Sequence, residues 1–234
     1  MMKFEKVLFT DDFVEKLEKL RHIKLIINRK IGKNRLQEIL ESKGYTCLAI
    51  DEVNIFSLAG PALSCVIKIK PQKIRGVKDS KQLTRKQIYR LAETIKKRAD
   101  MYAFGIVWPQ EINEEVSIQK ASHLSKLRAL GKLNLSEKIV LLVDYYPIPE
   151  FHGYSIGVLY GDEKVFSISC ASILAKAYVN RIMEELDKEY PQYGWKTNCG
   201  SPTKQHYEAI KKYGLTKWHR IDFCKKFPQL KGYI

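Results

Sequence analysis

The spacing of apolar residues changes along the chain, and each spacing predicts a different kind of element. From Asp11 to Leu40, apolar side chains recur near helical spacing, and Gly44 ends this segment. Short apolar runs then predict strands over residues 46–53, 62–69, 101–108, 138–144 and 154–160. The run from Ile139 to Val143 is apolar throughout, so we expect that strand to be buried on both faces.

Segments of helical spacing alternate with the later strands. Thr84 and Gln87 form a capping-box pattern that predicts a helix start. Further helices are predicted over residues 118–133, 165–190 and 202–213. The order of elements predicts an α/β fold whose mixed five-stranded sheet is flanked by helices. We expect a helical N-terminal appendage over residues 1–44, the α/β domain over 45–195, and a basic helical C-terminal segment over 196–234 that packs on it.

The net charge adds a class of partner to this picture. The 234 residues carry a formal charge of +15, which favours a polyanionic partner such as nucleic acid. A lysine-rich surface without such a partner would give the same charge. Basic and aromatic residues interleave beyond Trp195, which suits a surface that grips a nucleic-acid backbone. Aromatic side chains that simply dock on the core would explain the same composition.

Other classes of protein are disfavoured. The five cysteines are odd in number and form no C-x-x-C pair, which argues against a disulfide framework and a zinc ribbon. The first residues lack the apolar region of a signal peptide. The apolar run from Ile139 to Val143 is far too short to cross a bilayer. We expect a cytoplasmic protein without a membrane partner.

Carboxylates at strand ends are the first candidate chemistry. Asp51 and Glu52 end the first predicted strand, and Asp144 ends the fourth, where α/β folds often place their sites. If these strands are neighbours, the acids need a cation between them, and hard oxygen ligands favour Mg²⁺ or Mn²⁺. Successive strand residues point to opposite faces, so Glu52 joins Asp51 only if the strand ends or bulges there. Turn or capping roles would explain these acids equally well.

A polar stripe on the long predicted helix is the second candidate. Ser169, Ser172, Lys176 and Asn180 recur at intervals that put them on one helical face. The stripe would face either the carboxylates or water, and the spacing alone favours water.

A series of short motifs resembles bacterial ribonuclease HII. The motifs occur in family order over roughly residues 46–225. They are Asp51-Glu52, Leu58-Ala59-Gly60-Pro61, Asp79-Ser80-Lys81-Gln82-Leu83, Gly105-Ile106-Val107, Pro109-Gln110-Glu111-Ile112, Leu142-Val143-Asp144, Gly161-Asp162, Ala171-Ser172-Ile173-Leu174-Ala175-Lys176, Tyr190-Pro191-Gln192-Tyr193-Gly194, Pro202-Thr203-Lys204-Gln205-His206 and His219-Arg220. The chain is thus similar to a type 2 ribonuclease H, and the resemblance implies a ribonuclease H-like fold.

The resemblance also implies an activity. The family cuts the RNA strand of RNA–DNA hybrids and nicks beside ribonucleotides embedded in DNA, using four carboxylates and divalent metals. Asp51, Glu52 and Asp144 match three of the four. A two-metal hydrolysis with Mg²⁺ or Mn²⁺ follows, in which one ion activates water and the other stabilises the leaving oxygen. The expected partner is an RNA–DNA hybrid or ribonucleotide-containing DNA, and we expect a monomer.

Further positions match residues that contact nucleic acid in the family, and some depart from it. The matching positions are Asp79, Ser80, Lys81, Lys176, Thr203 and Lys204. The fourth carboxylate aligns with Asn180, which brings no charge, so one metal should bind more weakly. The family's Gly-Arg-Gly falls at Asn54-Ile55-Phe56, and its junction-sensing tyrosine is Ser201.

These departures leave two interpretations open. The first is an active ribonuclease with relaxed recognition of the ribonucleotide–DNA junction. The second is a catalytically impaired relative that binds hybrids. A DNA resolvase of the same fold is a third, and the block from Asp79 to Leu83 argues against it.

Overall fold

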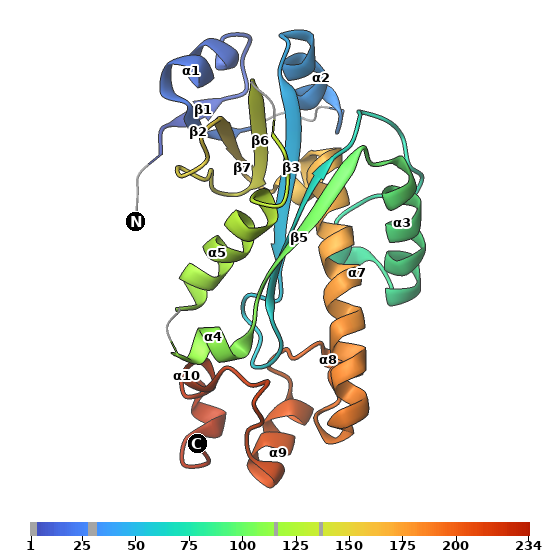
Figure 1. The fold of residues 1–234 in the computed structure, drawn as a ribbon, viewed down its shortest axis with the longest axis vertical. Helices are drawn as coiled ribbons and strands as arrows, with labels where there is room; N and C mark the ends of the chain where they lie inside the picture. The colour runs from blue at the N-terminus through green and yellow to red at the C-terminus, as the bar shows by residue number, and fades with distance from the viewer. Residues whose placement is uncertain (1–3, 28–31, 115–116, 136–137) are drawn as a thin grey trace. The chain divides into compact units, whose positions relative to one another are not determined.

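The computed structural model describes residues 4–27, 32–114, 117–135 and 138–234 (Figure 1). The chain divides into two compact units. Unit 1 comprises Met1–Asp51, Cys65–Ala103 and Lys132–Leu174. Unit 2 comprises Glu52–Ser64, Phe104–Gly131 and Ala175–Ile234.

The strands form a seven-stranded sheet in the order β1-β2-β7-β6-β3-β4-β5. Their bounds are β1 Lys6–Leu8, β2 His22–Ile26, β3 Thr46–Val53, β4 Ala62–Lys68, β5 Met101–Val107, β6 Ile139–Asp144 and β7 Tyr154–Val158. The pairs β1–β2, β2–β7, β7–β6 and β6–β3 are all parallel. The α/β fold and each of the five predicted strands are confirmed, and the expected strand number of five is corrected to seven.

Both additional strands lie in the N-terminal segment that was predicted to be helical. Helix α1 (Phe13–Leu20) ends at Arg21, whose φ of 61° cannot continue a helix. Residues 22–26 then extend and pair with β7 in unit 1. The apolar residues Ile23 and Leu25 alternate across this strand, which a reading of helical spacing missed. Residues 1–44 therefore widen the sheet, while the three domain boundaries stay predictions.

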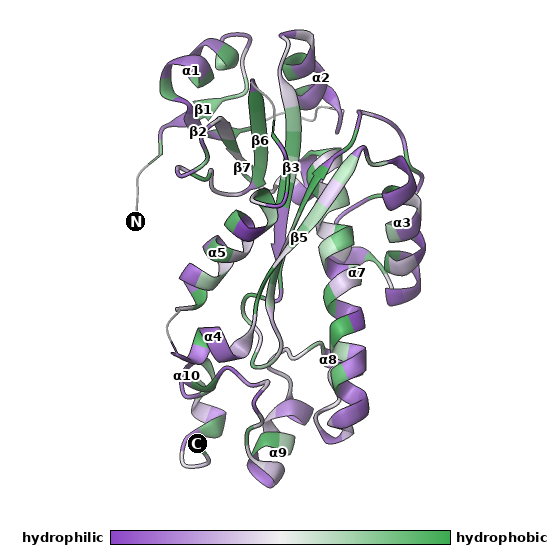
Figure 2. Ribbon diagram, viewed as in Figure 1, coloured by the Kyte–Doolittle hydropathy of each residue, from purple (hydrophilic) through white to green (hydrophobic). Residues whose placement is uncertain are grey.

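The centre of unit 1 is the strand β6. Its apolar residues are almost completely buried, from Ile139 to Val143, as expected for a strand covered on both faces. Figure 2 shows β6 as hydrophobic, in contrast to the hydrophilic residues along α3 (Arg85–Arg98). The register joins Thr46 to Ile139 and Ile50 to Val143, so Asp51 of β3 lies beside Asp144, the last residue of β6.

The remaining helices follow the predicted order. Thr84 and Gln87 make the expected capping box at the start of α3. The other helical elements are α2 Arg35–Ser42, η1 Ser80–Gln82, α4 Pro109–Glu114, α5 Ile118–Leu130, α6 Gly161–Lys164, α7 Phe166–Glu189, η2 Pro191–Tyr193, α8 Trp195–Asn198, α9 Lys204–Tyr213, α10 Ile221–Cys224 and η3 Pro228–Leu230. Within the described residues, no helix is long and apolar enough to cross a membrane.

In unit 2, the packing of α5 is set by a glycine in β5. A Cβ atom on Gly105 would lie 1.8 Å from the carbonyl oxygen of Ser125 and 2.5 Å from the backbone nitrogen of Ala129. Only glycine permits this approach. The hydroxyls of Ser64 and Ser125 hydrogen-bond at 2.6 Å, which fixes α5 further. This contact places the next residue of α5, Lys126, in the protein interior.

Candidate active site

Two aspartates stand side by side at the carboxyl ends of β3 and β6. Asp51 and Asp144 each follow the paired residues Ile50 and Val143, so their side chains point to the same face of the sheet. Asp51 is only 6% exposed. Burial and the Asp51 carboxylate both raise the pKa of the buried thiol of Cys65 in β4. Two acids thus share one edge of unit 1, as the sequence predicts for neighbouring strands.

A third acid lies beside Asp144. The backbone nitrogen of Gly161 donates to Asp144 Oδ1 at 2.7 Å, and Asp162 follows directly in the chain. A Cβ atom on Gly161 would lie 3.2 Å from Asp144 Oδ1 and 2.7 Å from Ile168 Cδ1, so glycine allows the close approach. Asp162 is buried at 6% exposure. We call Asp51, Asp144 and Asp162 the acidic edge.

Lys81 neutralises part of the acidic edge. Its Nζ lies 3.2 Å from Asp162 Oδ2, although the lysine side chain itself is 80% exposed. Partial burial disfavours the charge of Lys81, but attraction by Asp162, Asp79 and Asp144 outweighs it and raises the pKa of Lys81. Asp79 caps η1 by accepting from the backbone nitrogen of Lys81 at 2.9 Å. The Ser80 hydroxyl bonds to Ser172 at 2.9 Å.

Glu52 is engaged elsewhere, within unit 2. Its Oε2 lies 2.9 Å from Nζ of Lys126, and its Oε1 accepts from the Ser122 hydroxyl at 3.3 Å. Strand β3 continues to Val53, so neither an end nor a bulge separates Asp51 from Glu52. The condition for both side chains to share a face is not met. Among the described residues, no group of three or more His, Cys, Asp or Glu side chains is arranged to hold a metal.

The polar stripe on α7 is buried, contrary to the preference for water that its spacing suggests. Ser169 donates to the carbonyl oxygen of Asp162 at 2.6 Å and accepts from Lys33 at 3.2 Å. In unit 2, Asn180 is 2% exposed, and its Oδ1 accepts from the Cys199 thiol at 3.0 Å. Lys176 is half-buried. The stripe is therefore part of the hydrogen-bonded interior, and metal binding by Asn180 stays a prediction.

The loop that follows β3 is held by a buried arginine. Arg220 is completely buried, and its guanidinium donates to three backbone carbonyls. The acceptors are Gly60 at 2.9 Å, Ile55 at 2.6 Å and Asn54 at 2.6 Å. Burial lowers the pKa of Arg220 to about 9, so the group remains charged at neutral pH. We call residues 54–60 with these bonds the clamped loop.

The side chain of Asn54 makes its hydrogen bonds to residues of the clamped loop and to the next residue, Pro61. Its Nδ2 donates to the carbonyls of Ala59 at 3.3 Å and Pro61 at 2.9 Å, and its Oδ1 accepts from the Ser57 hydroxyl at 2.5 Å. Its φ is 62°, a conformation that asparagine tolerates better than most residues. The predicted contact of Asn54 with nucleic acid stays a prediction.

A neutral histidine pair supports the segment around Ser201. Thr216 donates its backbone N–H to Nδ1 of His219, which leaves the proton of His219 on Nε2, 3.1 Å from Nε2 of His206. His206 then carries its proton on Nδ1 and donates to the carbonyl of Ser201 at 3.0 Å. Trp195 Nε1 also donates to His206. Burial lowers the pKa of His206 to about 4 and that of His219 to about 3.

Thr203 and Lys204 stand at the start of α9. The Thr203 hydroxyl accepts from the backbone nitrogen of His206 at 3.2 Å, so this residue is an N-cap. Lys204 is exposed, as a residue that contacts phosphate must be. Their predicted contacts with nucleic acid are untested.

Comparison with known proteins decides the family. A family model described as Ribonuclease HII matches residues 48–226. The chain belongs to the ribonuclease HII family. The Ribonuclease HII of Clostridioides difficile strain 630 is 42% identical over 185 residues, which are 78% of this chain and 72% of that protein. The resemblance predicted from the motifs is confirmed.

Solved structures agree with the ribonuclease H-like fold. The crystal structure of the ribonuclease H2 from Pyrococcus horikoshii OT3 matches with a TM-score of 0.65 and 25% identity, over 80% of this chain and 96% of its own. Bst-RNase HIII in complex with Mn²⁺ matches with a TM-score of 0.62 and 17% identity, over 81% of this chain and 69% of its own. At that identity the second likeness shows the fold alone.

For a ribonuclease HII chain, motif matching missed three informative residues. Asp162 appeared only as part of a Gly-Asp motif, yet it lies at the acidic edge. Arg220 appeared in the His219-Arg220 motif without a role of its own, yet it clamps the loop. Lys126 gave no signal, since a lysine on a predicted helix is expected in solvent.

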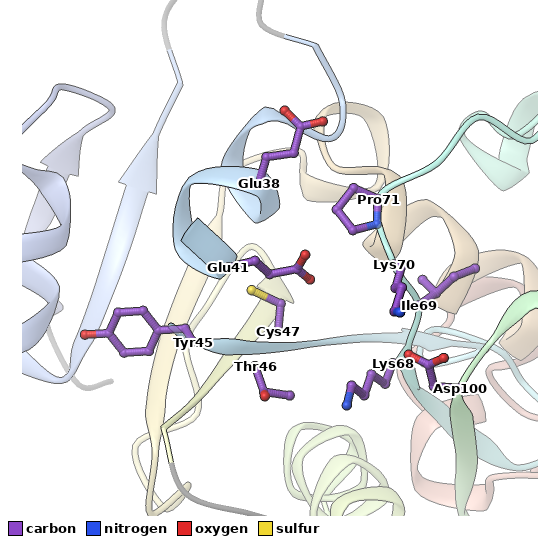
Figure 3. A pocket seen from close by; sticks show the side chains of 10 residues that line it. All are labelled: Glu38, Glu41, Tyr45, Thr46, Cys47, Lys68, Ile69, Lys70, Pro71 and Asp100. Atoms are coloured by element: carbon purple, nitrogen blue, oxygen red, sulfur yellow. The ribbon is translucent and has the colours of Figure 1, made fainter. Parts of the chain in front are cut away.

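A pocket of about 470 Å³ lies at the opposite end of β3, in unit 1 (Figure 3). Thr46 and Cys47 contribute to its wall, so it stands some four residues, or about 13 Å, from Asp51 along the strand. Its lining mixes acids such as Glu41 with lysines such as Lys68. None of its lining residues belongs to the acidic edge.

Proposed function

We propose that this protein is a metal-dependent endoribonuclease that cleaves the RNA strand of RNA–DNA hybrids. Membership of the ribonuclease HII family supports the reaction class. The observation that carries the proposal to specific residues is the pairing of Asp51 with Asp144 on one face of the sheet. Such a pair, beside Asp162, concentrates negative charge that only a cation can offset fully.

The donor atoms at this edge suit a hard divalent cation. Carboxylate oxygens are the preferred ligands of Mg²⁺ and Mn²⁺, and ribonucleases of this family depend on divalent metal. We propose Asp51, Glu52 and Asp144 as ligands of two ions. When bound, the ions would supply an activated water and stabilise the leaving oxygen. Glu52 must exchange its ion pair with Lys126 for this role.

Two residues compete as the remaining ligand. Alignment of motifs points to Asn180, whose amide would bind one metal more weakly. The geometry of unit 1 favours Asp162, because Gly161 ties it to Asp144 and because it carries a charge. Asp162→Asn and Asn180→Asp separate the two. A loss of cleavage in the first variant supports Asp162, and a gain in the second supports Asn180.

The surrounding residues would bind and orient the hybrid. Lys81 is exposed and beside the acidic edge, where it can exchange Asp162 for a phosphate. We propose similar backbone contacts for Asp79, Ser80, Lys176 and Lys204. The carbonyls of Asn54 and Ile55 each already accept a hydrogen bond from Arg220, which leaves them less free to accept from a 2′-hydroxyl. This supports relaxed recognition of the ribonucleotide–DNA junction.

We propose that the protein acts as a monomer in the cytoplasm. All five cysteines are buried, and none of them is in a disulfide, as suits a reducing compartment.

A cleavage assay tests the function directly. Labelled RNA–DNA hybrid and DNA with one embedded ribonucleotide are incubated with the protein in Mg²⁺ and in Mn²⁺. We expect metal-dependent cleavage, with the continuous RNA tract preferred. Binding without cleavage, in the natural protein and in Asn180→Asp alike, would favour the impaired relative. Efficient nicking at the single ribonucleotide would contradict relaxed recognition.

A further inference from the structure

Phe56, at the tip of the clamped loop, has an exposed fraction of 72%. Among the described residues, this is the highest exposed fraction of any large hydrophobic side chain. Burying a phenylalanine stabilises a protein by roughly 1.5–3 kcal/mol. A single exposed apolar residue is ordinary by itself. The surrounding loop decides whether Phe56 is held in this position.

The loop prevents Phe56 from folding back onto the surface. Arg220 fixes the carbonyls of the two preceding residues, Asn54 and Ile55, with bonds of 2.6 Å. Beyond Phe56, the backbone nitrogen of Leu58 donates to Gly200 at 2.8 Å. The loop is therefore restrained on both sides of its exposed ring.

The residue before Phe56, Ile55, anchors the loop to the core of unit 2. Ile55 packs against the core cluster of unit 2, which includes Ala62, Val107 and Ile112. Ile55 and Phe56 are the two residues of a turn, in which Ile55 is partly buried and Phe56 is exposed. The same turn thus packs one large apolar side chain on unit 2 and presents the next to solvent.

The distance of Phe56 from Glu52 along the chain and the charge of the protein indicate which kind of partner Phe56 contacts. It follows Glu52 by four residues, so it lies within about 14 Å of that carboxylate-bearing residue along the chain. A nucleic-acid strand rises about 3.4 Å per nucleotide, so this reach covers a few nucleotides. The net charge of +15 favours a polyanion at this surface over an acidic or neutral protein groove.

We propose that Phe56 is a substrate-binding residue that packs on a base or sugar face of the bound RNA–DNA hybrid. Base and sugar rings offer a flat apolar face to an aromatic side chain, whatever their sequence. A ring that is already fixed loses little conformational entropy on binding. The proposal rests on the proposed function for the identity of the substrate, and its own content is the contact made by Phe56.

The test measures affinity and cleavage separately. Binding of a labelled hybrid is followed by fluorescence anisotropy in EDTA, and KM and kcat are measured in Mg²⁺. Phe56→Ala should weaken affinity and raise KM by about 5-fold to 150-fold, as for loss of one stacked base, with little change in kcat. Phe56→Trp should retain affinity, and addition of hybrid should quench its emission more strongly than that of the natural protein, which already has three tryptophans.

The matched control is Leu8→Ala, which removes another exposed apolar side chain, 50% exposed, from β1 in unit 1. It should leave affinity unchanged. The melting temperature of Phe56→Ala should equal that of the natural protein, because an exposed ring contributes little to folding. Affinity of Phe56→Ala within two-fold of the natural protein, with no stronger quenching in Phe56→Trp than in the natural protein, overturns the proposal. Failure of the natural protein to cleave any hybrid refutes the proposed function instead, and the affinity measurements still decide the role of Phe56.

Discussion

The acidic edge of unit 1 and the clamped loop of unit 2 differ in how far their charged and polar groups are satisfied within the protein. At the acidic edge, carboxylates lie close together, and an exposed lysine, Lys81, offsets part of their charge. In the clamped loop, the polar groups of Asn54 are all used internally, and the buried charge of Arg220 meets three carbonyls. The first arrangement leaves charge that a ligand can satisfy. The second leaves only an apolar ring, Phe56.

This difference distinguishes the residues that we expect to act in cleavage from those that we expect to contact the substrate. The positions of Asp51 and Asp144 follow from strand register, which the buried core of β6 enforces. A loop sequence is under no such constraint from the sheet, so it can change while the acids remain.

The largest expected effect comes from Asp144→Asn at the acidic edge. The amide keeps an oxygen to accept from Gly161 but loses the charge that a metal requires. Cleavage should fall by at least about 100-fold, since even outer partners of metal ligands contribute about 10- to 100-fold. Thermal unfolding serves as the control and should change little. Retained cleavage would place the chemistry at another site.

Arg220→Ala tests the clamped loop in the same way. Three buried carbonyls would lose their donor, each at a cost of about 1–3 kcal/mol. The free energy of unfolding, measured in urea, should fall by roughly 3 kcal/mol or more. Lys225→Ala, which removes an exposed ion pair with Asp222, is the control and should cost less than about 1 kcal/mol. Equal effects of both changes would show that the loop is not held by Arg220.

Acid should weaken unit 2 through its histidine pair. The pKa values of His206 and His219 are lowered by burial to about 4 and about 3, against 6.5 for an ordinary histidine. The unfolded chain therefore binds more protons below pH 6.5, so stability is complete above that pH and falls toward pH 4. Each imidazole contributes about 1.4 kcal/mol per pH unit.

Urea unfolding at pH 7.5 and 5.5 measures this effect. The loss between the two should approach roughly 2–3 kcal/mol for both imidazoles. His206→Gln should show a smaller loss, because one titrating group is gone. A stability that is flat across this range would mean that the folded protein and the unfolded chain bind the same number of protons, so that the pKa values of the pair are not lowered.

Lys81→Met should have the smallest effect. Lys81 is one cation in a chain of net charge +15, and its phosphate contact contributes one released counterion. The slope of log affinity against log salt should become less steep by about one unit. Anisotropy titrations at several salt concentrations give the slope. An unchanged slope would mean that Lys81 pairs with the acids and makes no contact with phosphate.

The sheet was largely predictable because periodicity records burial directly. The bounds of β3 were predicted to the residue, and Asp51 and Asp144 could be paired from strand ends alone. Strands β1 and β2 were not predicted, because their few apolar positions lie in a segment whose spacing also fits a helix. The parallel pairing of β2 with β7 depends on residues more than a hundred positions away.

The contacts of individual charged side chains could not be predicted from the sequence either. Glu52 is expected at the acids because it matches a family carboxylate, and no local pattern indicated that its carboxylate pairs with Lys126 on α5. That pair forms because Gly105 lets α5 approach the sheet, a tertiary contact with no local pattern. Arg220 likewise resembled a surface residue until its three backbone partners were known.

The bonds of Arg220 also bear on how the protein is made. They join positions 160 to 166 residues apart in the chain. During synthesis, the segment after Asp51 leaves the ribosome long before Arg220 does, and it has no donor for these carbonyls until then. A nascent or truncated chain ending before Arg220 therefore carries the acids without the clamped loop. The order of translation therefore delays assembly of the clamped loop until residue 220 has been made.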